Sequence, residues 1–124
     1  MKLETEKLAL MDLTETMKTL MSVTTYKIGT YTFDVEKRLL IHGSSSVKLT
    51  AKEAYLLVLF ATNPSAILER KYILQTIWKE DNFRTSRSMD VYITKLRKYL
   101  SEDPALNIKN IHGAGFQLIV RDDE

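Results

Sequence analysis

The stretch that decides the fold of this chain is RTSRSMDVYITKLRKYL, residues 84–100. Its apolar residues recur at the spacing of one buried helical stripe, formed by Met89, Ile93, Leu96 and Leu100. A different face of the same helix carries Arg87, Val91, Thr94, Lys95 and Lys98. Five of the seventeen residues are Lys or Arg and one is acidic. Such a basic amphipathic helix suits a DNA major groove, a membrane surface or plain solvent, so the flanking sequence must decide.

Two further helices are predicted ahead of this stretch. Thr50 and Glu53 have the spacing of a capping box at the start of TAKEAYLLVLFATN, residues 50–63, and the Asn63-Pro64 pair ends that helix. A short helix, RKYILQTIW, is predicted over 70–78, followed by a polar loop, KEDNFRTSR, over 79–87. Three successive helices favour a helix-turn-helix arrangement, although this loop is longer than the usual turn of about three to four residues.

Strands are predicted on both sides of the helices. Residues 24–50 alternate polar and apolar side chains in short runs, as in TYTFDV, which indicates a small antiparallel sheet with a structural role. Residues 107–120, NIKNIHGAGFQLIV, predict a hairpin that turns at Gly113-Ala114-Gly115. A hairpin directly after a recognition helix is a wing. The Gly-x-Gly spacing leads into a strand and lacks a third glycine, so it does not predict a nucleotide site.

Residues 1–25 are predicted to be a separable linker or short amphipathic helix. Leu3, Leu10 and Met17 are seven apart, and Asp12 with Glu15 suggests a capping box that starts a helix near Leu13. A helix docked on its own domain is the favoured interpretation. A dimerisation helix remains open.

Composition narrows the function classes. A chain of 124 residues, 44% apolar and 27% charged, suits one globular domain; it has no cysteine and two scattered histidines, so no metal site or cofactor is expected. No nucleophile lies beside a histidine and an acid in a catalytic pattern, and an enzyme is not expected. The N-terminal segment has neither a signal-peptide nor a membrane-spanning pattern, so the predicted location is the cytoplasm. Residues 26–124 carry +3 and residues 1–25 carry −1, so the basic excess in the net charge of +2 belongs to the second part.

Three motifs, in this order, resemble the effector domain of the OmpR/PhoB family of two-component response regulators. They are LTAKEAYLLVLFATNPSAILERKYILQTIW (49–78), RTSRSMDVYITKLRKYLSEDP (84–104) and IKNIHGAGFQL (108–118). The resemblance covers roughly residues 26–120. It implies an α+β winged helix-turn-helix with an N-terminal antiparallel β platform, a three-helix core and a C-terminal β-hairpin wing, over residues 26–124.

The resemblance also implies a function, namely sequence-specific binding of double-stranded DNA in transcription regulation. The recognition helix, about 88–100, would enter the major groove, and the wing, about 109–116, would follow the backbone or minor groove. Residues expected to contact DNA are Arg84, Arg87, Ser88, Val91, Tyr92, Thr94, Lys95, Arg97, Lys98, Lys109 and His112. A loop over 79–87 is expected to meet RNA polymerase, chiefly through Lys79, Glu80, Asp81, Asn82 and Phe83.

Individual roles follow if the resemblance holds. Lys95 is the first choice for a contact with guanine, and Val91 for a thymine methyl group. Arg87 and Arg97 are expected at phosphates. Asp90 is expected to be structural, in the first turn of the helix. The other expected structural residues are Trp78 and Phe83, as core and loop anchors, and His42, at a strand end.

The family pattern differs from this chain in places. Ser88-Met89 stands where Thr-Val is usual, and His112 stands where the wing usually carries Arg. The resemblance implies a receiver domain and a sensor kinase, with control by a phosphorelay, in a full-length protein. Residues 1–25 are too few to form the receiver. An excised effector domain is favoured over a free-standing winged helix. On DNA the expected state is a monomer or weak head-to-tail dimer. The alternative function is a protein-interaction winged helix that binds an acidic partner surface.

Overall fold

A four-stranded antiparallel sheet forms the platform of the molecule. The computed structural model describes residues 13–121. The platform consists of β1 (Thr25–Ile28), β2 (Tyr31–Asp34), β3 (Leu39–His42) and β4 (Ser45–Lys48), each paired with the next. Alternate side chains point into the core, among them Ile28, Phe33 and Leu40, because successive residues of a strand face opposite sides of a sheet. The predicted N-terminal sheet is confirmed.

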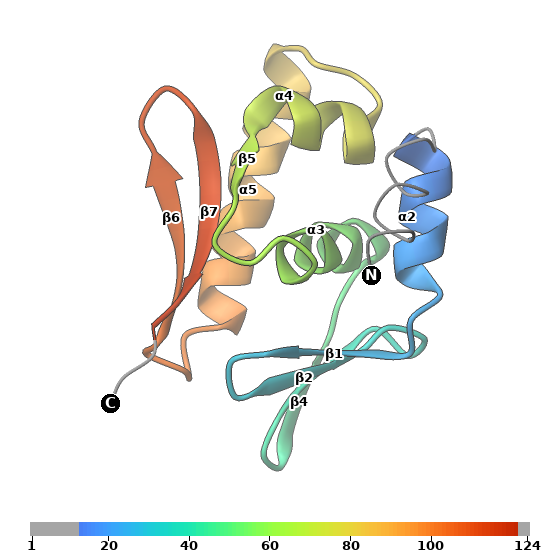
Figure 1. Ribbon diagram of the computed structural model, residues 1–124, viewed down its shortest axis with the longest axis vertical. Coiled ribbons are helices and arrows are strands. Elements are labelled where there is room, and N and C mark those ends of the chain that lie inside the picture. Colours follow the sequence, from blue (N-terminus) through green and yellow to red (C-terminus); the bar gives the residue numbers. More distant parts are fainter. Residues whose placement is uncertain (1–12, 122–124) are drawn as a thin grey trace.

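The helix α3 (Ala51–Ala61) runs through the centre of the core, above the platform (Figure 1). Its start is fixed by the predicted capping box: Glu53 N donates to Thr50 Oγ1 at 3.3 Å, and Thr50 N donates to Glu53 Oε1 at 2.8 Å. Both groups would otherwise lack a partner within the helix. Every residue from Glu53 to Phe60 except Tyr55 is buried.

The next helical segment changes its hydrogen-bond pattern halfway. It comprises the α-helix α4 (Arg70–Ile73) and a turn of π-helix, η1 (Leu74–Trp78). Its extent matches the predicted helix over 70–78. Ile73, Leu74 and Ile77 enter the core, and the chain leaves η1 through Lys79, which has a left-handed backbone with φ of 65°. The last helix is α5 (Phe83–Tyr99).

A second sheet carries the C-terminal hairpin. The strands β6 (Leu106–Ile111) and β7 (Gly115–Val120) pair antiparallel and form the predicted hairpin. A third strand, β5 (Ile67–Glu69), pairs with β7 and was not predicted, since three residues are too few for a period-two pattern. The order β5-β7-β6 places the hairpin on one flank of α3 (Figure 1).

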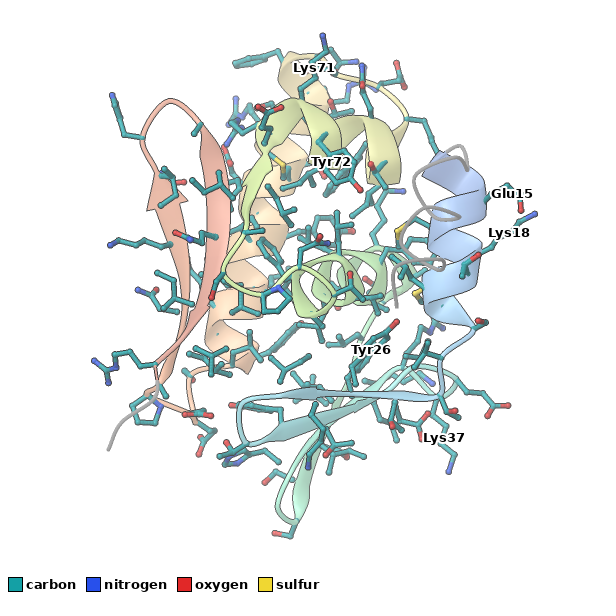
Figure 2. The ribbon with its side chains drawn as sticks, viewed as in Figure 1. Glu15, Lys18, Tyr26, Lys37, Lys71 and Tyr72 are labelled. Carbon is teal, nitrogen blue, oxygen red and sulfur yellow. The ribbon has the colours of Figure 1, made fainter. Side chains whose placement is uncertain are left out.

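The helix α2 (Leu13–Met21) covers the opposite flank (Figure 1). It packs on α3 and η1, and Met17 is buried in the same core as the helices. Tyr26 Oη donates to Leu20 O at 2.7 Å and joins α2 to the platform. Figure 2 shows Glu15 and Lys18 on the outer side of α2. The predicted stripe through Leu3 and Leu10, and the Asp12 cap, lie outside the described residues.

The platform is also joined to the end of α5. Asp103, on the turn after α5, accepts hydrogen bonds from Thr30 N at 2.8 Å and Thr30 Oγ1 at 3.0 Å, both at Oδ2, and from Ala105 N at 3.0 Å. These bonds lower the pKa of Asp103, chiefly those from the Thr30 and Ala105 backbones. His42 Nε2 lies 2.9 Å from Thr30 Oγ1, which is the kind of contact that the predicted structural role requires.

Candidate nucleic-acid interface

The helix α5 begins one residue before the predicted helical stretch 84–100 and five residues before the recognition helix expected from about 88. Asn82 caps it: Thr85 N donates to the Asn82 side chain at 3.0 Å, and Asn82 N donates to Thr85 Oγ1 at 3.0 Å. Residues from Phe83 to Arg87 are therefore helical, and the loop predicted over 79–87 ends at Asn82. The prediction that Phe83 is a core or loop anchor is wrong, because its side chain is 77% exposed. Arg87 lies over the Phe83 ring, 5.6 Å from the centroid.

The helix α5 has one face buried in the core and an opposite face exposed to solvent. The predicted stripe of Met89, Ile93, Leu96 and Leu100 is buried, with at most 3% exposure. The opposite side of the helix is exposed and carries three cations beside two uncharged residues. We call this the outward face of α5; it consists of Arg84, Arg87, Val91, Thr94 and Lys98.

An exposed valine lies at the middle of this face. Val91 is 54% exposed, so the core does not account for it. Thr94 donates its hydroxyl to Asp90 O at 3.0 Å, one turn earlier in the helix, which leaves its side chain close to the helix axis. The centre of the outward face therefore combines small side chains with a cation on either side along the helix, Arg87 and Lys98. This is a surface that allows another molecule to approach the helix backbone closely.

One flank of α5 faces η1 and α3. Tyr92, predicted to contact DNA, is half-buried and lies edge-on to Trp78, with ring centroids 5.5 Å apart. Ser88 is also half-buried on this flank. Lys95 is exposed, but its Nζ lies 4.0 Å from Oε2 of the buried Glu53 and 5.7 Å from the centroid of the Tyr92 ring. The structure thus places Lys95 beside the outward face and not at its centre.

The other flank of α5 is tied to the second sheet. Arg97, predicted at a phosphate, donates through Nε to Ile108 O of β6 at 2.9 Å. Asp90 forms an ion pair with Arg70 of α4 at 3.0 Å. Because α5 starts at Phe83, Asp90 lies in the third turn of the helix, and the prediction of a first-turn position is wrong.

Arg70 joins three elements, and the sequence offered no signal for it. Besides the Asp90 ion pair, its guanidinium donates to Ser86 Oγ and lies over the Phe116 ring of β7, 5.6 Å from the centroid. Arg70 and Arg97 together connect α5 to β6 and β7, which fixes the hairpin beside the outward face.

The hairpin presents its own polar side chains. Lys109 and His112 are exposed, the first on β6 and the second in the turn that connects the strands. Gly113 has φ of 74°, a conformation that suits glycine, while Gly115 lies inside β7. A Cβ atom on Gly115 would lie 2.0 Å from Leu68 O, so this glycine lets β5 approach β7.

Metal-ligand clusters and membrane-spanning helices are two features not found among residues 13–121. These residues contain no group of three His, Cys, Asp or Glu side chains able to hold a metal ion. In the same range, none of the helices is both long enough and apolar enough to cross a lipid bilayer.

Comparison with known families and proteins gives a consistent result. The family described as "Transcriptional regulatory protein, C terminal" matches residues 44–118. The transcriptional regulatory protein RprY of Bacteroides fragilis is 50% identical over 99 residues, which are 80% of this chain and 42% of RprY. The chain therefore spans less than half the length of this relative.

Solved structures with the same fold include DNA-binding domains. The DNA-binding domain of RstA from Klebsiella pneumoniae, solved in complex with the RstA box, superposes with a TM-score of 0.67 at 27% identity, over 80% of this chain and 100% of that one. The DNA-binding domain of CadC from E. coli gives a TM-score of 0.70 at 20% identity, over 80% of this chain and 94% of that one, and shows the fold alone. The predicted winged-helix architecture is confirmed.

Proposed function

Because this chain belongs to the family of transcriptional regulatory protein C-terminal domains, the OmpR/PhoB effector family that the motifs predicted, we propose that it binds double-stranded DNA in a sequence-specific manner as the output domain of a response regulator. The observation that carries the proposal is the outward face of α5, whose cations flank small side chains on a helix held firmly by its opposite face. The solved complex of the RstA domain with the RstA box also supports the proposal of DNA binding.

The cations and the small residues of α5 have different expected roles on DNA. Cations such as Arg84, Arg87 and Lys98 neutralise phosphates and release counterions, which gives affinity for any duplex. Val91 is suited to a thymine methyl group, and Thr94 allows the helix to lie deep in the major groove. The hairpin, through Lys109 and His112, is placed to contact the adjacent backbone or minor groove.

The structure changes the order of the candidate contacts. Arg97 and Tyr92 are engaged within the protein, so we rank them below the outward face as DNA contacts. Ser88 is half-buried and ranks with them. Lys95 reaches DNA from the flank of the helix, where Glu53 also attracts it.

We also propose an RNA polymerase contact at the N-terminal end of α5. Glu80, Asp81 and Asn82 are exposed in the loop before the helix, and Phe83 follows them with its ring in solvent. An exposed aromatic side chain beside charged groups is typical of a protein-binding surface. A receiver domain, a sensor kinase and a cytoplasmic location are the corresponding proposals for a full-length protein.

The experiment that tests DNA binding is selection from a pool of random duplexes at low and at higher salt, followed by sequencing. Wild type is compared with Val91→Ala, Lys98→Ala and the control Lys37→Ala, which removes an exposed lysine from the platform turn between β2 and β3 (Figure 2). We expect wild type to enrich one short motif and Val91→Ala to blur it at one position.

Lys98→Ala should weaken all duplexes alike and lower the salt slope by about 1, while Lys37→Ala changes neither quantity. If wild type retains no duplex at low salt, the proposal is wrong, and a protein partner with an acidic surface becomes the function to test. Such a partner would show a shallower salt dependence.

A further inference from the structure

Lys95 is held away from the outward face of α5 by groups of the protein itself. Its Nζ lies 4.0 Å from Glu53 Oε2 and 5.7 Å from the Tyr92 ring centroid, while its side chain remains 52% exposed. The ammonium therefore lies between solvent and the first turn of α3. Any phosphate or base edge that binds this ammonium has to draw it from the carboxylate of Glu53.

Glu53 is equipped to keep its charge when Lys95 leaves. Its side chain is 2% exposed, and it accepts hydrogen bonds from Thr50 N at 2.8 Å and from Tyr99 Oη at 3.2 Å. It also lies in the first turn of α3, where the helix dipole favours a negative charge. Among the described residues, Thr50, Tyr99 and Lys95 contact the carboxylate, and Lys95 is the one with a long exposed side chain that can turn outward.

We infer that Glu53 is a positioning residue that competes with DNA for the ammonium of Lys95 and so sets the strength with which α5 engages DNA. This inference rests on the proposed function. Binding exchanges one partner of Lys95, a buried carboxylate, for another, the nucleic acid. The net contribution of Lys95 to affinity is therefore smaller than that of a lysine without an internal partner.

Glu53→Gln isolates the charge from the shape. Glutamine at the third position of a helix still completes a capping box, because its carbonyl oxygen accepts from Thr50 N in place of Oε1. Its amide NH2 then takes the place of Oε2 and can donate to Tyr99 Oη. Once the charge is gone, we expect duplex affinity to rise by about two- to fivefold. The same substitution in a Lys95→Ala background should change affinity very little, whereas in a Lys98→Ala background it should keep its full effect.

Tyr99→Phe provides a test of opposite sign. Removing the hydroxyl donor leaves the Glu53 carboxylate more dependent on Lys95, so we expect DNA binding to weaken. Glu53→Gln and Tyr99→Phe each remove a native interaction, yet their expected effects on DNA affinity are opposite. A common loss of folding would weaken binding in both variants. Thermal unfolding of each variant, and the salt slope of each, separate the two cases, since the slope reports the number of phosphates neutralised.

The outcomes distinguish the inference from the proposed function. An equal gain from Glu53→Gln with and without Lys95 would mean that the carboxylate simply repels phosphates, and it would overturn the inference while DNA binding stands. Weaker binding by Glu53→Gln in every background would also overturn it, and would assign the residue to folding. Absence of duplex binding by wild type itself would remove the proposed function and the inference together.

Discussion

Gly115→Ala tests how closely β5 must approach β7. A Cβ atom at this position would lie 2.0 Å from Leu68 O, 2.8 Å from Leu68 C and 2.9 Å from the Cα of Glu69. All three atoms belong to backbone, so no side chain can turn away, and β5 has to retreat by well over an ångström. Overpacking of a core lowers the free energy of unfolding by about 1–3 kcal/mol. Because the obstacle here is rigid backbone, we expect Gly115→Ala to lower it by about 3 kcal/mol or more.

Gly113→Ala is the matched control in the same hairpin. Nothing lies within 4 Å of a Cβ built there, and its cost comes only from φ of 74°, about 1–2 kcal/mol. At about 4–8 °C per kcal/mol for a small domain, Gly115→Ala should lower Tm by about 12 °C or more and Gly113→Ala by distinctly less. Circular dichroism melting curves measure both shifts. If Gly113→Ala is the more damaging variant, the argument from close approach is wrong.

Three further predictions concern the links that position α5. Arg97→Lys keeps the charge but loses the bond from Nε to Ile108 O, so urea denaturation should show a loss of about 1 kcal/mol; unchanged stability would identify Arg97 as a simple surface cation. Asp90→Asn should lower the free energy of unfolding by about 0.5 kcal/mol or less, and only at low salt. Arg70→Met should lower it further at any salt, because this variant also loses the contacts of Arg70 with Ser86 and Phe116. The folded-state pKa of Asp103 is lowered, so its stabilisation is present above about pH 4 and is lost as pH falls through that pKa; Asp103→Asn should lower Tm at neutral pH and flatten its decline in acid, and an unchanged acid profile would contradict this role.

Much of the fold was accessible from the sequence because local signals agreed with the tertiary structure. The capping box at Thr50 and the buried stripe from Met89 to Leu100 are confirmed. The cap of α5 was not predicted, and the loop was drawn as far as residue 87, because Asn82 and Thr85 cap each other, a pair that the usual Ser/Thr with Glu/Gln signature does not include. The π-helical turn η1 and the strand β5 depend on packing partners far away in the sequence.

The candidate site was only partly predictable. The periodicity of α5 separates outward from inward residues, which placed Val91 and Lys98 correctly in solvent. Periodicity does not show which exposed side chain already has a partner within the protein, so Lys95 was ranked first and Arg97 was placed among the phosphate contacts. Their partners, Glu53 and the Ile108 carbonyl, come from other elements that only the folded chain brings close. Phe83 was misplaced because apolar residues are not confined to the interior.

The strand β5 also has a consequence for the order of folding. The hairpin of β6 and β7 closes through a short turn, which requires little loop-closure entropy. Ile67 and Gln117 pair across about fifty residues, and all of α4, η1 and α5 lie between them. The helices must be folded back before this pairing can form. We therefore expect the three-stranded sheet to be completed late in refolding, and the amides of β5 to exchange with solvent before those of β7.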